Sequence, residues 1–72
     1  MNQQYSKRMG SHLARLRQGL TQEQLAARLQ VQGCDLTRSA LAKIEVGQRN
    51  LYPDEIKALT EVLTVSYEQL FI

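Results

Sequence analysis

Residues 19–50, GLTQEQLAARLQVQGCDLTRSALAKIEVGQRN, contain the starts and ends of two consecutive short helices. Thr21 is suited to cap the first of them, because Gln24 stands three residues later and completes a capping box. The apolar side chains that follow repeat on one helical face: Leu25, Ala26 and Leu29. This helix is expected to run to Gln32, because Gly33 can adopt the left-handed conformation that ends helices.

The second helix of this stretch begins in the same way. Thr37 can cap it, and Leu36 before the cap can pack on Leu41 within it, which fixes the direction of the entering chain. Leu41 and Ile44 then face inward, and Gly47 ends the helix. Two capped helices joined by a turn are therefore the centre of the fold.

Three further helical patterns surround this pair. Spacings of four, four and three residues place one apolar stripe on the first segment: Tyr5, Met9, Leu13 and Leu16. That segment is expected to end near Gln18–Gly19. Pro53 suits the first position of a fourth helix, because its missing N–H has no partner there anyway. The apolar face of that helix holds Ile56, Leu59, Val62 and Leu63.

Ser66 and Gln69 form a second capping box, which predicts a short fifth helix at the end of the chain. No stretch of β-branched or aromatic residues alternates with polar ones, so no strand is predicted. The sequence therefore indicates an all-α fold of five short helices in one domain, residues 1–72.

The composition excludes several classes of protein. Hydrophobic residues at 43% and charged residues at 22% are typical of a globular domain. One cysteine and one histidine are too few for a disulfide framework, a usual zinc site or a catalytic nucleophile with its base. We therefore expect no enzyme, no metal and no other cofactor. The lack of a signal peptide and of a membrane-spanning run favours a cytoplasmic, nucleoid-associated location.

Charge is distributed unevenly along the chain. Residues 1–49 carry a net charge of +5, from eight basic and three acidic side chains, whereas residues 50–72 carry −3. A basic segment of this kind favours a polyanion as partner. A solvated surface with accidental clustering explains the same numbers equally well.

Three motifs in this order resemble the lambda-repressor and Cro type of helix-turn-helix family: GLTQEQLA at residues 19–26, IE.G.R at residues 44–49, and LTVSYEQLF at residues 63–71. The resemblance extends over residues 9–71. It implies a compact five-helix domain that binds double-stranded DNA and reads the major groove with its third helix, residues 37–46. The function it implies is a transcriptional regulator, chiefly a repressor, of bacterial or phage origin.

The first turns of this third helix carry side chains suited to base edges: Arg38, Ser39, Ala42 and Lys43. Arg38 can bond O6 and N7 of guanine together, and Ser39 offers a hydroxyl. A positive charge at the first position of a helix opposes the helix dipole, so helix stability does not account for Arg38. The methyl of Ala42 can touch a thymine methyl, and Lys43 can reach a base or a phosphate.

The resemblance also implies contacts with DNA phosphates from residues near the two helices: Gln22, Thr37, Gln48, Arg49 and Asn50. For Gln22 there is a physical reason as well, because a helix N-terminus presents free N–H groups to an anion. Taken alone, Gln22 is an ordinary exposed helical residue, and Thr37 is a cap before it is a phosphate contact.

In the family pattern, positions matching Arg15 and Glu45 form a largely buried ion pair between the first helix and the recognition helix. We therefore expect these two residues to hold the third helix in place and not to contact DNA.

The sequence departs from the family between the second and third helices. Val31 and Leu41 lie ten positions apart, and the extra QGCDL, residues 32–36, resembles small phage-like and Gram-positive regulators with a longer connection. Cys34 lies in this turn; a plain loop thiol is the simpler interpretation, and a redox switch is the alternative. Thr64 replaces the glycine that commonly follows the fourth helix.

One half-site gives modest affinity, so we expect a homodimer on a two-fold DNA site. The residues for its interface are Tyr67, Leu70, Phe71 and Ile72, although Leu70 and Phe71 can instead close the core. Two alternatives share this fold: an antitoxin with a toxin partner, and a restriction–modification controller protein. A third alternative is a helical protein-interaction module that binds no DNA.

Overall fold

The computed structural model describes residues 3–17 and 19–71, with side chains described from Lys7 onward. It contains five helices: α1 (Gln3–Leu16), α2 (Gln22–Val31), α3 (Arg38–Glu45), α4 (Pro53–Leu63) and α5 (Tyr67–Phe71). No strand occurs within those residues, and the predicted all-α class is confirmed. The side chain of Tyr5 and the whole of Ile72 lie outside the described part.

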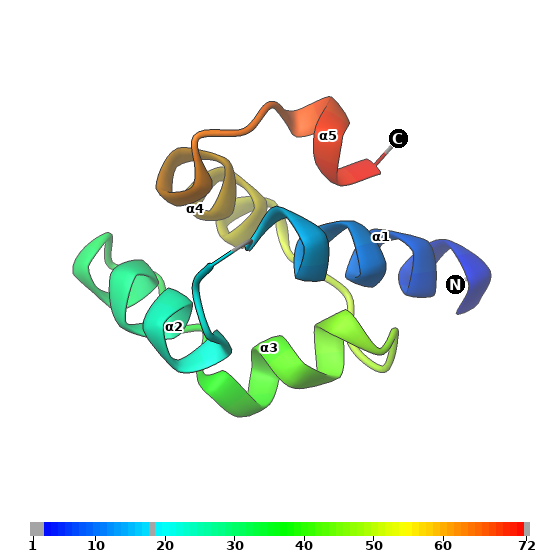
Figure 1. Ribbon diagram of the computed structural model, residues 1–72, viewed down its shortest axis with the longest axis horizontal. Coiled ribbons are helices and arrows are strands. Elements are labelled where there is room, and N and C mark those ends of the chain that lie inside the picture. The colour runs from blue at the N-terminus through cyan, green and yellow to red at the C-terminus, as the bar shows by residue number, and fades with distance from the viewer. Residues whose placement is uncertain (1–2, 18, 72) are drawn as a thin grey trace.

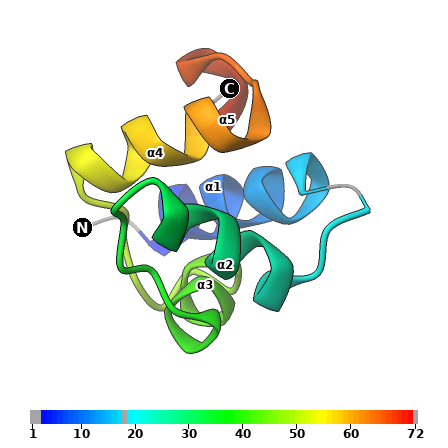
Figure 2. The ribbon, with the colours of Figure 1, turned by 90° about the vertical axis from the view of Figure 1, so that its left-hand side faces the viewer.

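α1 lies in the middle of the molecule, between the α2–α3 pair on one side and the α4–α5 pair on the other (Figures 1 and 2). It contacts α3 and α5, while α2 contacts α3 and α4. The α2–α3 pair is thus supported by α1, which packs on α3, and by α4, which packs on α2. Among the described residues, no helix is long and apolar enough to cross a lipid bilayer.

The predicted helix starts are confirmed in their hydrogen bonds. The Thr21 hydroxyl accepts the N–H of Gln24 at 3.0 Å, and the Gln24 side chain accepts the N–H of Thr21 at 2.8 Å. Ser66 and Gln69 exchange the same two bonds ahead of α5. Pro53 is the first residue of α4. Local sequence therefore determines where these helices begin.

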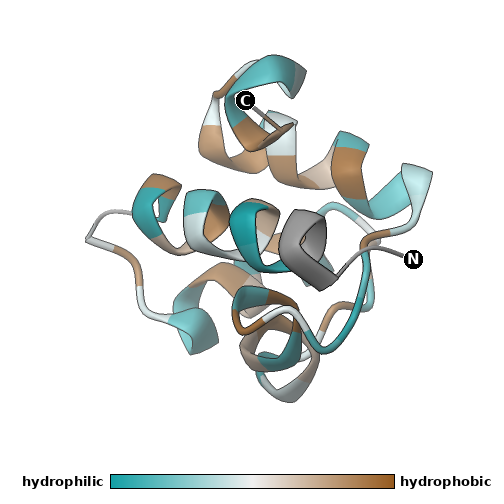
Figure 3. Cartoon of the chain, turned by 90° about the vertical axis from the view of Figure 1, so that its right-hand side faces the viewer, coloured by the Kyte–Doolittle hydropathy of each residue, from teal (hydrophilic) through white to brown (hydrophobic). Residues whose placement is uncertain are grey.

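The core is built mainly from leucines contributed by all five helices and the α2–α3 turn. The largest fully buried side chains are Leu13, Leu25, Leu29, Leu36, Leu41, Ile44, Leu59 and Leu70. Figure 3 shows that the helices carry both hydrophilic and hydrophobic segments, as expected for helices with one face on a core. Leu36 and Leu41 are both buried in this core, as expected if they pack together at the start of α3.

Two glycines bring α1 and the end of α3 close together. A Cβ on Gly10 would lie 2.6 Å from the carbonyl oxygen of Glu45, so only glycine lets the two backbones approach this closely. Gly47 has φ +81, and a Cβ there would lie 2.7 Å from Cγ of Lys7. The position of α3 against α1 therefore depends on both glycines.

The helix ends agree with the prediction for α2 and α3, and differ for α1. Gly33 has φ +83 and Gly47 has φ +81, which is the left-handed ending expected at both positions. α1, however, ends at Leu16, earlier than the predicted Gln18–Gly19. Gln18 is outside the described residues.

Candidate nucleic-acid interface

The outer face of α3 presents the side chains that the sequence assigns to base contacts. Arg38, Ser39 and Lys43 are exposed, and Ala42 is half-buried. Leu41 and Ile44 on the opposite face are completely buried. The packing of α3 therefore directs the four predicted contacts to one accessible surface.

A hollow of about 540 Å³ lies where the N-termini of α2 and α3 approach each other. Its lining residues are Arg17, Thr21, Gln22, Glu23 and Arg38. The Arg38 guanidinium and the N-terminus of α2 favour an anion here, whereas the Glu23 carboxylate opposes it and the Arg17 guanidinium is already paired with Glu45. Thr37 caps α3 nearby in sequence, where its hydroxyl accepts the N–H of Ala40 at 3.1 Å.

Three helices are joined at the Glu45 carboxylate. Arg17 donates from Nε to Oε2 and from Nη2 to Oε1, the latter at 2.9 Å, and Gln22 donates from Nε2 to Oε1 at 2.9 Å. Arg17 Nη1 also donates to the carbonyl oxygen of Leu20 at 2.8 Å. The hydrogen bond to Glu45 raises the pKa of Arg17, burial opposes this, and the negative charge of Glu45 adds to the rise.

The predicted partner of Glu45 was wrong, because Arg17 takes the place expected for Arg15. α1 ends at Leu16, so Arg17 stands where the chain turns toward α2 and faces the end of α3. Arg15 lies two residues earlier, on an exposed face of α1. An arginine does pair with Glu45, as predicted. The end of the first helix was placed too late in the sequence, so the wrong arginine was named.

The Gln22 side chain makes a contact within the protein. Its amide donates a hydrogen bond to Glu45 and so holds α2 to α3, which leaves the main-chain N–H group for the expected phosphate contact. N–H groups at the start of a helix are the kind of donor that attracts an anion.

A family model described as helix-turn-helix matches residues 12–70 of the chain. The chain belongs to the lambda-repressor-like helix-turn-helix family. Its structure is similar to the crystal structure of the restriction-modification controller protein C.AhdI from Aeromonas hydrophila, with 32% sequence identity, a TM-score of 0.81 and 96% of each chain covered. No curated protein sequence matches. The chain is accordingly a DNA-binding regulator of this family.

In this helix-turn-helix domain, the loop after α3 is held by an ion pair that the sequence analysis did not find. Arg49 Nη1 and Nη2 donate to the two carboxylate oxygens of Glu55, at 3.0 and 2.9 Å. The guanidinium also lies 5.1 Å from the centre of the Tyr52 ring. The predicted phosphate ligand Arg49 is thus largely engaged within the protein, beside the exposed Gln48 and the half-buried Asn50.

Glu55 has two functions in the domain, because its Oε1 also accepts the N–H of Tyr52 at 2.9 Å and so caps α4. Burial raises the pKa of the Glu55 carboxyl, but the hydrogen bonds from Arg49 and Tyr52 lower it, and the net pKa lies below its usual range. The signal in the sequence was the three-residue spacing of Tyr52 and Glu55, which is a capping-box spacing without the usual Ser or Thr.

At the C-terminus of the domain, one predicted interface residue belongs to the core. Leu70 is completely buried, because α5 packs on α1 and His12 Nδ1 lies 3.2 Å from the Leu70 carbonyl oxygen. Phe71 is half-buried, and its ring centre lies 4.8 Å from that of Tyr67. Tyr67 is 61% exposed. Tyr67 and part of Phe71 are the apolar surface that α5 offers.

Proposed function

We propose that the chain is a sequence-specific regulator of transcription that reads double-stranded DNA in the major groove with α3. The observation that carries this proposal is the two-sided character of α3. Arg38, Ser39 and Lys43 are exposed on one side, and the other side is fixed to α1 through Gly10 and Glu45. A helix held this rigidly presents its first-turn side chains to base edges at a defined angle.

Arg38 is the proposed reader of guanine, through bidentate bonds to O6 and N7. Ser39, Ala42 and Lys43 complete the base contacts as the sequence analysis assigns them. The hollow at the N-terminus of α2 supports a phosphate contact by main-chain N–H groups near Gln22, opposite the Arg38 guanidinium.

Further phosphate contacts are proposed for residues on either side of α3: Thr37, Gln48, Arg49 and Asn50. Besides its proposed phosphate contact, Arg49 fixes the conformation of the loop after α3 through its ion pair with Glu55. A loop of fixed shape makes phosphate contacts that set the angle of the domain on the duplex.

We also propose that two copies bind a two-fold site, with half-sites ~34 Å apart. The exposed Tyr67 ring, tilted against the ring of Phe71, supports α5 as the contact between copies. The regulator would act as a repressor and would reside in the cytoplasm, where the DNA is.

A second candidate is control of restriction–modification genes. The 32% identity with the controller protein C.AhdI over 96% of both chains favours it. Adjacent restriction-enzyme and methyltransferase genes would support this role. A neighbouring toxin gene would favour the antitoxin alternative.

The testing experiment is fluorescence anisotropy of labelled DNA from around the chain's own gene, against a scrambled duplex, over a salt series. We expect a preference of ~10³-fold for the gene's own DNA. Arg38→Ala should abolish most of this preference. Arg15→Ala removes the same charge from an exposed site on α1 and should retain the preference.

Equal affinity and equal steep salt slopes for both duplexes would mean phosphate contacts alone, and would contradict sequence-specific reading. No binding to either duplex at low salt would favour the protein-interaction module.

A further inference from the structure

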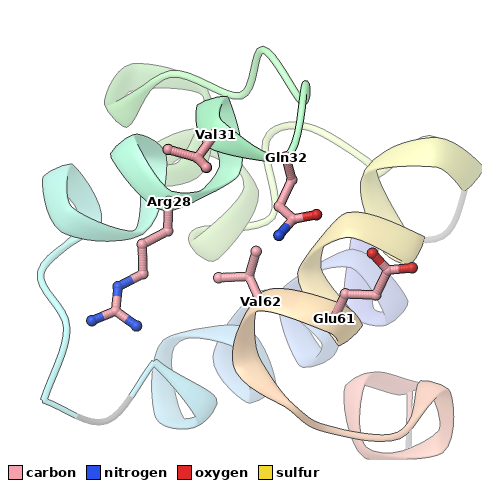
Figure 4. A pocket seen from close by; sticks show the side chains of 5 residues that line it. All are labelled: Arg28, Val31, Gln32, Glu61 and Val62. Carbon is pink, nitrogen blue, oxygen red and sulfur yellow. The ribbon is translucent and has the colours of Figure 1, made fainter.

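A second hollow, of about 360 Å³, lies between α2 and α4 (Figure 4). Its lining residues are Arg28, Val31, Gln32, Glu61 and Val62, and none comes from α3. Val31, at the end of α2, is 86% exposed, which makes it the most exposed large apolar side chain in the described chain. This surface is separate from the proposed DNA contacts and exposes apolar area that folding leaves uncovered.

Charges of opposite sign stand on the two sides of these valines. In Figure 4 the Arg28 guanidinium lies on one side of Val62 and the Glu61 carboxylate lies on the other. Both side chains are exposed, and within the described part of the chain neither has an ion-pair partner. The surface therefore has an apolar centre with a positive and a negative end.

We propose that this α2–α4 face binds the same face of a second copy of the chain, related by a two-fold axis through the valines. A two-fold rotation exchanges the two ends, so each Arg28 meets the Glu61 of the other copy. The same rotation carries each protruding Val31 toward the hollow of the other copy. A uniformly acidic or basic partner would meet a like charge at one end, which disfavours it.

This contact goes beyond the proposed function, because it uses neither α3 nor α5. Its five lining residues are far fewer than the roughly 20–30 residues per partner of a standard stable interface. We therefore expect weak association that depends on protein concentration. Combined with a contact through α5, it would join dimers into larger assemblies.

The test is sedimentation velocity without DNA over a protein concentration series, comparing the wild type with Arg28→Glu and with Glu61→Arg. Each single variant places two like-charge pairs across the two-fold axis, so its self-association should fall about tenfold or more. An equimolar mixture of the two variants pairs opposite charges at both ends. The mixture should therefore associate about as well as the wild type.

Lys57→Glu is the matched control, because it reverses an exposed charge on α4 outside the hollow and should leave association unchanged. Repeating the series in a Tyr67→Asp background separates this contact from the one proposed on α5. Thermal unfolding of each variant checks that the domain is folded.

In the Tyr67→Asp background, a mixture that associates no better than either variant alone would overturn the two-fold proposal, as would single variants that associate like the Tyr67→Asp protein itself. Neither result bears on DNA binding, which the anisotropy experiment with Arg38→Ala tests separately.

Discussion

Arg17 and Glu45 connect the end of α1 to the last residue of α3, and the Glu45 side chain is only 8% exposed. The carboxylate accepts hydrogen bonds from Arg17 and from Gln22, so it holds α1, α2 and α3 together. A charge in this position is stable only while its partners remain, because it has little access to water.

Arg17→Ala should lower the free energy of unfolding by about 1–3 kcal/mol, because it leaves Glu45 with one neutral donor. Urea unfolding followed by circular dichroism measures this. Arg15→Ala, on the exposed face of α1, should change stability by less than about 0.5 kcal/mol. The opposite order of the two effects would restore Arg15 as the partner of Glu45.

Gly10→Ala should destabilise the domain by about 1–3 kcal/mol, even though alanine is the better helix former. The new methyl would lie 2.6 Å from the Glu45 carbonyl oxygen and would push α1 away from α3. Gly19→Ala is the control, since nothing lies within 4 Å of a Cβ at that position. Equal unfolding midpoints for the two variants would show that the close approach at Gly10 is unimportant.

Thr64→Gly should stabilise the domain by about 0.5–1 kcal/mol, because a β-branched residue is strained in the left-handed conformation. Thr64 has φ 55 at the end of α4, where glycine fits without strain. In contrast, Thr60→Gly within α4 should cost stability, as glycine does inside any helix. Thermal unfolding of both variants should therefore show shifts of opposite sign.

The Arg49–Glu55 ion pair should make stability depend on pH in the acid range. Because the pKa of Glu55 is lower in the folded protein than in the unfolded chain, its contribution is complete above the unfolded pKa of about 4.3. It is lost as the pH falls through the lower, folded pKa. Glu55→Gln should thus be less stable than the wild type at pH 7, by about 1 kcal/mol.

Urea unfolding at a series of pH values measures the difference between Glu55→Gln and the wild type. The difference should shrink toward zero as the carboxyl becomes protonated. Glu61→Gln, at an exposed site, should run parallel to the wild type throughout. A difference that stays constant down to the lowest pH would contradict the ion-pair explanation.

The helices could be predicted from the sequence because their signals are local. A cap such as Thr21 with Gln24 acts within one turn, and an apolar stripe such as Leu13 and Leu16 follows the helical period. The structure confirms these features, and neither depends on residues far away in the sequence.

The contacts between helices were less predictable, because each depends on where another element ends. Because α1 ends at Leu16, Arg17 and not Arg15 forms the ion pair with Glu45. The role of Gly10 depends on carbonyl groups some 35 positions away in sequence, and glycine inside a helix gives no indication of its partner. Leu70 was assigned to both a core and an interface because an apolar residue near a chain end suits either.

The glycines at positions 10 and 47, with the ion pair of Arg17, tie α3 to α1 more directly than the six-residue turn 32–37 ties it to α2. The side chains at positions 38, 39, 42 and 43 take no part in these attachments. Under the proposed function, DNA preference can therefore evolve, or be engineered, at those four positions without disturbing the contacts between the helices. Because these attachments do not involve residues 32–37, the turn can differ in length without releasing α3.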